Sequence, residues 1–157
     1  MLIQIDHVNL VVADLERMTA FYRDVLGLRV TKEVTISGPW IARAVGLEDG
    51  ADVEADVVYL DLPSGPRVEL IHYRHPAGAT PEQLGQPNTV GLRHLAFKVD
   101  DIDAAVATMK SRGVEFFSDV QTVPNTQVIY AGGVRKRLVY FHDPEGNLLE
   151  LCEYKVT

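Results

Sequence analysis

Two stretches of the chain show the same change of hydrophobic period, from alternating positions to helical spacing. Around His7, in DHVNLVV, apolar and polar residues alternate, as in a β-strand that buries one face. A helical apolar face follows and consists of Leu15, Met18, Phe21, Tyr22 and Val25. Asp14 is the predicted N-cap of this helix, and Gly27 is predicted to end it.

The second stretch, RHLAFKVDDIDAAVATMKSRGV, begins at Arg93 and repeats this order between Asp101 and Gly113. His7 and His94 are 87 positions apart, as are Asp14 and Asp101. The segments RVEL and LLEL, which contain Glu69 and Glu150, form a second echo at a separation of 81. We therefore predict an internal duplication.

The remaining pattern predicts an α+β fold in which each half runs strand, helix and then three strands. Turn residues bound the further predicted strands, at about 28–36, 53–62, 66–73, 114–119, 126–131, 136–142 and 147–154. A short helix is expected at 38–46, inserted between strands. We expect one domain over 1–157, with module one at about 1–74, a Pro- and Gly-rich linker at about 75–88 and module two at about 89–157.

Composition and charge narrow the possible functions. The net charge of −7 disfavours non-specific nucleic-acid binding, which depends on attraction to phosphates. The amino-terminal segment lacks the continuous apolar run of a signal peptide or a membrane span, so we expect a cytoplasmic protein that does not bind membranes. The single cysteine, Cys152, excludes an internal disulfide.

Four residues at matching places in the duplication are candidate metal ligands. His7 and His94 lie on the first strand of each half, and Glu69 and Glu150 lie on the last. Imidazole and carboxylate together suit a divalent Zn, Ni, Co, Mn or Fe ion. A lone His or Glu on a strand is usually solvated or hydrogen-bonded, so the prediction depends on the joint recurrence of the four.

These motifs, with FHDPEGNLLEL near the end of the chain, resemble the glyoxalase I, bleomycin-resistance and extradiol-dioxygenase superfamily, also called vicinal oxygen chelate proteins. The resemblance covers essentially the whole chain. It implies paired βαβββ modules whose curved sheets form a cleft, and one divalent metal ion held by His7, Glu69, His94 and Glu150. A homodimer is also expected, with the site either within one chain or shared between two.

All four ligand positions are occupied, which resembles glyoxalase I and methylmalonyl-CoA epimerase more than the other branches. The implied chemistry is removal of a proton beside a carbonyl group, with the cation as Lewis acid. We expect a lyase or isomerase of the lactoylglutathione lyase type, with Glu150 favoured over Glu69 as the base and Glu48 as a further candidate. A methylmalonyl-CoA epimerase, an antibiotic-binding resistance protein and a small extradiol dioxygenase are the alternatives.

Three residues are candidate contacts for a small-molecule substrate, such as a thiol adduct or a thioester. Arg135 and Arg137 flank Lys136 in a basic run that could bind a carboxylate or phosphate. A solvated strand end explains this run equally well. Trp40, in the inserted helix, could cover the cleft or a dimer contact, although core packing is the more common role of such a residue.

Overall fold

The computed structural model describes residues 1–48 and 51–156 and divides into two units. The first unit is Met1–Thr80 and the second is Pro81–Thr157, so the division falls inside the predicted linker. Among the described residues, no helix is both long enough and apolar enough to cross a membrane.

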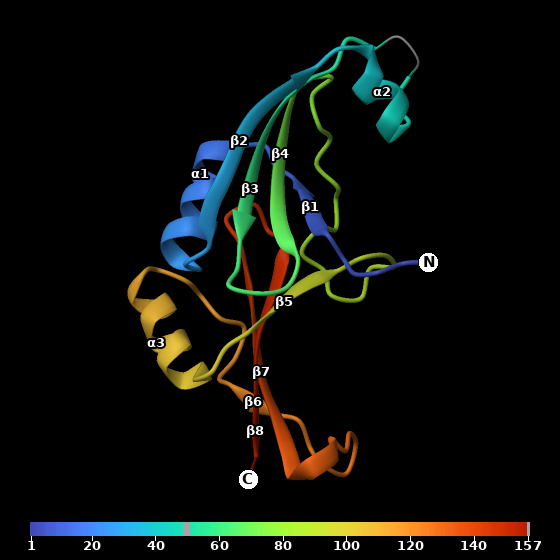
Figure 1. The fold of residues 1–157 in the computed structure, drawn as a ribbon. Helices are drawn as coiled ribbons and strands as arrows, with labels where there is room; N and C mark the ends of the chain where they lie inside the picture. The colour runs from blue at the N-terminus through green and yellow to red at the C-terminus, as the bar shows by residue number, and fades with distance from the viewer. Residues whose placement is uncertain (49–50, 157) are drawn as a thin grey trace. The chain divides into compact units, whose positions relative to one another are not determined.

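The first unit contains one four-stranded mixed sheet with two short helices (Figure 1). The strands lie in the order β1-β4-β3-β2, where β1 runs parallel to β4 and the other pairs are antiparallel. Its elements are β1 (His7–Val11), α1 (Leu15–Ala20), η1 (Phe21–Val25), β2 (Arg29–Ser37), α2 (Pro39–Val45), β3 (Glu54–Asp61) and β4 (Arg67–His75).

The second unit repeats this topology, with strand order β5-β8-β7-β6 and β5 parallel to β8. Its elements are β5 (His94–Lys98), α3 (Ile102–Ser111), β6 (Gln121–Thr122), η2 (Ala131–Gly133), β7 (Val134–His142) and β8 (Leu148–Val156). The predicted duplication of a strand, a helix and three strands is thus confirmed for the fold.

The two equivalent helices begin at the predicted caps. The Asp14 carboxylate accepts a hydrogen bond from the Arg17 amide at 3.0 Å, and Asp101 accepts one from the Ala104 amide at the same distance. These bonds satisfy amides that have no partner within the helix. The first helix widens into a π turn at η1, where the Leu26 amide donates to the Phe21 carbonyl, before the chain turns at Gly27 with a positive φ of 81°.

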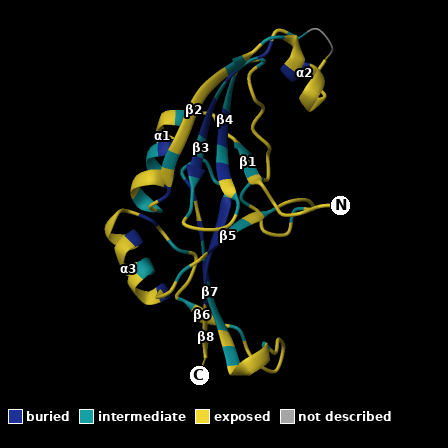
Figure 2. Ribbon diagram, in the orientation of Figure 1, coloured by how far each residue is buried: buried dark blue, intermediate teal, exposed yellow. Residues whose placement is uncertain are grey.

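Each sheet has one face toward its helix and one face that bears the predicted metal ligands. On the helix side of the first sheet Leu60, Val68 and Leu70 are buried, as are Met18 and Tyr22 of the helical segment. Figure 2 shows buried positions in dark blue along β3 and β4 and on α1. On the other side, strand pairing places Asn9 and Tyr59 beside Glu69. In the second unit it places Ala96 and Tyr140 beside Glu150. We call this second side the donor face of each sheet.

Two of the predicted strands are wrong. Residues 114–119 make only one bridge, Phe116 with Phe141, and the regular pairing resumes at β6. Residues 126–131 contain no strand, because the Pro124 carbonyl accepts hydrogen bonds from the Gln127 and Val128 amides and closes a turn. Local turn bonds therefore replace the ladder bonds that the β-branched residues suggested. The inserted helix, predicted at 38–46, is present as α2.

Candidate metal centre

The first unit brings His7 and Glu69 together on its donor face. The His7 Nε2 atom lies 3.4 Å from Glu69 Oε2, and the other ring nitrogen, Nδ1, lies 2.8 Å from the Asp6 carboxylate. The Asp6 contact favours the tautomer in which Nδ1 carries the proton, which leaves a lone pair on Nε2. The same hydrogen bond holds the pKa of Asp6 below its usual value. Two electron-pair donors therefore face each other, as around a cation.

Neutral groups hold the Glu69 carboxylate in place. The Asn9 amide donates to Glu69 Oε2 at 2.8 Å from the neighbouring strand. Tyr59 faces Glu69 on the opposite side, and its hydrogen bond to this carboxylate, together with burial, raises the pKa of Tyr59 to about 12. Glu69 therefore keeps a fixed orientation while its side chain remains 13% exposed.

The second unit holds an equivalent pair, which is more deeply buried. The His94 Nε2 atom lies 3.2 Å from Glu150 Oε2, and the Glu150 side chain is only 2% exposed. The Tyr140 hydroxyl donates to the same oxygen at 2.7 Å. Burial, followed by this contact with Glu150, raises the pKa of Tyr140 to about 12. The tyrosine therefore remains a hydrogen-bond donor across the physiological pH range.

A cation, Lys136, distinguishes the second pair from the first. Its Nζ atom lies 2.7 Å from Glu150 Oε1. Burial alone would lower the pKa of Lys136, but the negative charge of Glu150 outweighs this effect and raises it. Oε1 is buried and receives no aligned hydrogen bond from the described residues, so it keeps lone-pair capacity for another positive group.

The structure therefore shows a duplicated set of His, Glu and Tyr. Tyr59 and Tyr140 are 81 positions apart, the separation that also relates Glu69 to Glu150. Both tyrosines lie directly opposite the glutamate in the antiparallel ladder. Sequence reasoning missed both tyrosines, although the common separation was a usable signal. It also missed Asn9, which has Ala96 as its counterpart and so gives no repeat signal.

The donor chemistry of each pair fits a divalent transition metal, because imidazole nitrogen and carboxylate oxygen are the ligands that such ions accept. Within residues 1–48 and 51–156, no group of three or more His, Cys, Asp or Glu side chains converges as a metal site. Each unit by itself therefore supplies two of the four predicted ligands.

Comparison with known proteins identifies the family. The model of the Glyoxalase/Bleomycin resistance protein/Dioxygenase superfamily matches residues 4–151. The chain belongs to this superfamily. Members of the glyoxalase superfamily typically use a divalent metal, and the donor chemistry of the two His–Glu pairs agrees with such use.

Several curated relatives span nearly all of the chain. The protein YaeR of Escherichia coli (strain K12) is 34% identical, in an alignment that covers 96% of this chain and 95% of YaeR. The 2-epi-5-epi-valiolone epimerase of an Actinomyces species is 31% identical, covering 95% and 78%. The mitochondrial methylmalonyl-CoA epimerase of Mus musculus is also 31% identical, covering 94% and 71%. The lactoylglutathione lyase of Haemophilus influenzae is 24% identical.

Solved structures agree with the superfamily fold. A glyoxalase family protein from Bacillus cereus matches with a TM-score of 0.78 and 26% identity, covering 98% of this chain and 95% of that one. A glyoxalase family protein from Enterococcus faecalis matches with a TM-score of 0.64 and 26% identity, covering 96% and 97%. The predicted superfamily and its βαβββ fold are thus confirmed.

The other predicted site residues lie away from the two His–Glu pairs. Arg135 and Arg137 flank Lys136 along β7, so their side chains lie on the opposite face of the second sheet, the helix side. The Arg137 guanidinium makes two 2.8 Å hydrogen bonds to Asp103 and a 3.3 Å bond to Glu153. Of the basic run, only Lys136 therefore lies on the donor face.

In the inserted helix α2, the core residue is Ile41. It is buried with Ala42 and Val53, whereas Trp40 is 52% exposed. Trp40 therefore retains a surface suited to contact with a ligand or a partner. Glu48, the further candidate base, is exposed after the end of the helix.

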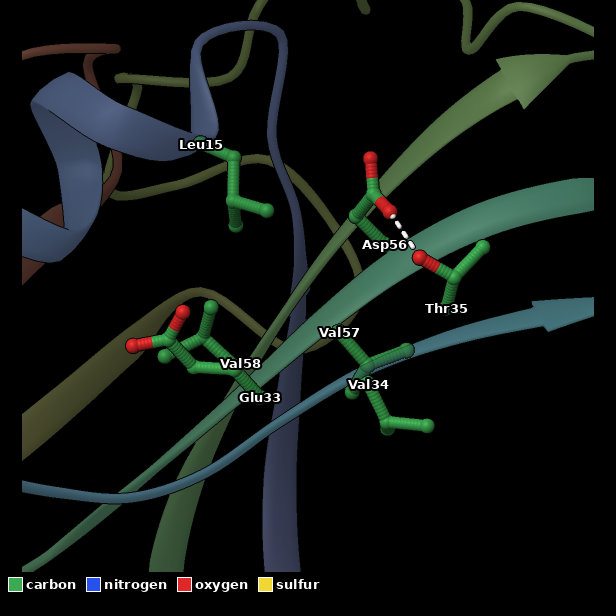
Figure 3. Close-up of a pocket in the computed structure, with 7 residues that line it drawn as sticks. All are labelled: Leu15, Glu33, Val34, Thr35, Asp56, Val57 and Val58. Atoms are coloured by element: carbon green, nitrogen blue, oxygen red, sulfur yellow. Dashed lines mark hydrogen bonds between the residues drawn. The ribbon is translucent and has the colours of Figure 1, made fainter.

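A pocket of about 320 Å³ lies on the first unit and is not part of the metal centre (Figure 3). Leu15, Glu33, Val34, Thr35, Asp56, Val57 and Val58 line it. Its carboxylate Asp56 accepts a 2.6 Å hydrogen bond from Thr35 and is paired with Arg74. The pocket contains none of the predicted metal ligands, and of its two carboxylates, Glu33 and Asp56, Asp56 is already paired with Arg74.

Proposed function

We propose that the chain is a metal-dependent enzyme that removes a proton from a carbon atom next to a carbonyl group. The observation that carries the proposal is the repeated His, Glu and Tyr set, found once in each unit at equivalent strand positions. Duplicated donors of this kind, in a superfamily that typically uses a divalent metal, are expected to serve one cation.

In this proposal His7, Glu69, His94 and Glu150 hold the divalent ion. When bound, such an ion supplies Lewis-acid stabilisation of the negative charge that develops on a carbonyl oxygen. Asp6 keeps the His7 ring in the tautomer that presents Nε2. Tyr59 and Tyr140 orient the two carboxylates through their hydrogen bonds.

Glu150 and Glu69 are the candidate bases. Each has one oxygen that faces the imidazole of its own unit. A base must reach the substrate proton within hydrogen-bond distance, and in this proposal a carboxylate beside the bound carbonyl group would be placed to do so. Glu150 remains our first choice and Glu69 our second.

The reaction is an isomerisation, an epimerisation or the related lyase reaction on a thiol adduct. The sequence motifs favour a reaction of the lactoylglutathione lyase type. Sequence identity to the relatives favours epimerisation, because two relatives named as epimerases are 31% identical to this chain and the relative named as a lyase is 24% identical. We therefore propose epimerisation of a compound with an acidic C–H bond as the first reaction to test, and the lyase reaction as the second.

The test begins with metal analysis of the purified protein. We expect about one divalent ion per set of four ligands. We also expect the protein to accelerate exchange of the α-proton of methylmalonyl-CoA with deuterium from D₂O, which proton NMR measures. Methylglyoxal plus glutathione is the parallel substrate. Bound metal with activity on either substrate supports the proposal; a metal-free protein that turns over neither would refute it and favour a binding protein of the antibiotic-resistance kind.

Two variants separate ligand from base. Glu150→Gln and Glu69→Gln remove the negative charge while keeping the side-chain shape, and Glu16→Gln on the exposed side of α1 is the matched control. A variant that retains the metal but loses proton exchange identifies the base. A variant that loses the metal identifies a ligand that the site cannot replace. Unchanged metal content and unchanged exchange in both variants would contradict the assignment.

A further inference from the structure

The donor face of the second sheet carries positive charge next to Glu150. Along β8, Glu150, Cys152 and Tyr154 are successive residues on this face. Lys136 pairs with Tyr154 in the ladder, and Lys98 pairs with Cys152. The two ammonium groups lie 5.9 Å and 6.0 Å from the centre of the Tyr154 ring. Lys98 is therefore two residue positions from Glu150 along the ladder and Lys136 is four, and the Lys136 side chain reaches back to the buried carboxylate.

In the first sheet the positions equivalent to Lys136 and Lys98 are apolar. Its own cations, Lys32 and Arg67, lie instead beside Tyr59, at 5.9 Å and 5.6 Å from the ring centre. The Lys136–Tyr154 pair of the second sheet corresponds to Ala55–Tyr73 in the first. The Lys98–Cys152 pair corresponds to Val11–Ile71. Ala55 and Ile71 are buried there with Val57 in an apolar cluster. Tyr73 and Tyr154 occupy equivalent positions, whereas lysines stand at these two places in the second sheet only.

Lys98 carries the charge that is available. Lys136 is already paired with Glu150 at 2.7 Å, but no carboxylate of the described residues lies within ion-pair distance of Lys98. Lys98 is exposed, in a protein whose net charge is −7. The Tyr154 ring lies beside both lysines and is itself packed edge-on against Tyr130, with ring centres 5.6 Å apart. This aromatic support limits the freedom of the lysine side chains.

We propose that Lys98, together with Lys136 and Tyr154, forms a subsite that binds an anionic group of the substrate, a carboxylate or a phosphate. Residues two apart on a strand are separated by about 7 Å. The anion would therefore lie roughly that distance along the strand from Glu150, as in a short organic acid with an acidic group a few bonds from its carbonyl. This substrate class rests on the proposed function, whereas the binding of the anion can be measured without any turnover.

The experiment measures the dissociation constants of three probes on the metal-loaded protein by titration calorimetry. Malonate presents carboxylates, inorganic phosphate presents phosphate, and malonamide is the neutral analogue of malonate. Lys98→Met removes the charge and keeps the length of the side chain. Lys110→Met, in the last turn of α3, is the matched control. Circular dichroism and metal content verify that each variant is folded and loaded.

We expect wild-type protein to bind at least one of the two anions, and Lys98→Met to weaken that binding about five- to tenfold, with Lys110→Met unchanged. Loss with malonate identifies a carboxylate subsite, and loss with phosphate alone identifies a phosphate subsite; both outcomes support the proposal. Equal affinities for both anions in wild type and Lys98→Met, or no anion binding at all, would overturn it. Turnover by wild-type protein in that case would leave the proposed function intact.

Discussion

A buried carboxylate, Glu153, ties helix α3 to the second sheet, and Glu153→Gln is the change that tests this link. Glu153 is 1% exposed, and its Oε1 atom accepts a 3.0 Å hydrogen bond from the amide of Ile102, the first residue of the helix. Arg137 reaches Oε2 at 3.3 Å and also binds Asp103, while Lys155 lies 2.9 Å from Oε1. Glutamine removes the charge and turns an amide group toward these donors.

The expected cost is about 2–4 kcal/mol, because a hydrogen bond to a buried charged group contributes about 1.5–3 kcal/mol and the amide cannot satisfy all three donors. The Lys155 contribution is small, since that side chain is half exposed and its ion pair is screened by solvent. Most of the loss therefore comes from the Ile102 amide and the Arg137 guanidinium.

Urea unfolding of wild type and Glu153→Gln at pH 7 measures this loss, and we expect the midpoint to fall by roughly 1–2 M. Lys155→Met is the control and should lower the free energy of unfolding by less than about 1 kcal/mol. Equal midpoints for wild type and Glu153→Gln would refute the role of the buried charge.

The difference between wild type and Glu153→Gln should also depend on pH. Burial alone would raise the pKa of Glu153, but the hydrogen bonds from Lys155, Ile102 and Arg137 outweigh it and hold the pKa below its usual value of 4.5. The unfolded chain therefore takes up this proton first as the pH falls. The stabilisation is complete above about pH 5 and is lost below that value, so the two unfolding curves should converge in acid. A gap that widens in acid would contradict this sign.

Three further changes have defined outcomes. Asp101→Ala removes the cap of α3 and should lower the free energy of unfolding by about 1 kcal/mol, measured by urea unfolding; no loss would exclude a capping role. Met18→Ala empties a fully buried position and should cost about 2–5 kcal/mol, with a thermal melt as the measurement and the exposed Leu92→Ala as the control. Asp6→Asn should weaken binding of the divalent ion about tenfold through His7, measured by competition with a chelator, and an unchanged affinity would argue against orientation by Asp6.

The fold was predictable where the sequence pattern is repeated and local. Asp14 and Asp101 cap their helices as expected, because a carboxylate just before an apolar helical run has few other uses. The segment 126–131 was not predictable from its β-branched residues, since turn bonds to the Pro124 carbonyl compete with the ladder. The π turn after Ala20 likewise leaves no clear trace in the sequence.

The candidate site was predictable in part. The repeat predicted that the four residues occupy equivalent places in the two halves. His7 lies close to Glu69, and His94 to Glu150, because the first and last strands of each half pair in parallel, which the sequence did not show. Lys98 was not predicted as a candidate substrate contact, because the sequence of one strand does not show which residues of the neighbouring strand lie beside it. Arg135 and Arg137 were predicted as substrate contacts and Lys136 was not, because the sequence alone did not fix which residues of that strand face the predicted metal ligands.

The tyrosine opposite each glutamate ties the candidate metal centre to the register of the two strands that carry this pair. The Tyr140–Glu150 contact crosses one rung between β7 and β8, so a slip of one residue between these strands would turn Glu150 toward α3 and bring Leu151 in its place. Such a slip would also carry Glu153 away from the amide of Ile102. Under the proposed function, correct pairing of β7 with β8 is therefore a condition for metal binding, and a molecule with slipped strands is expected to hold the metal ion less tightly.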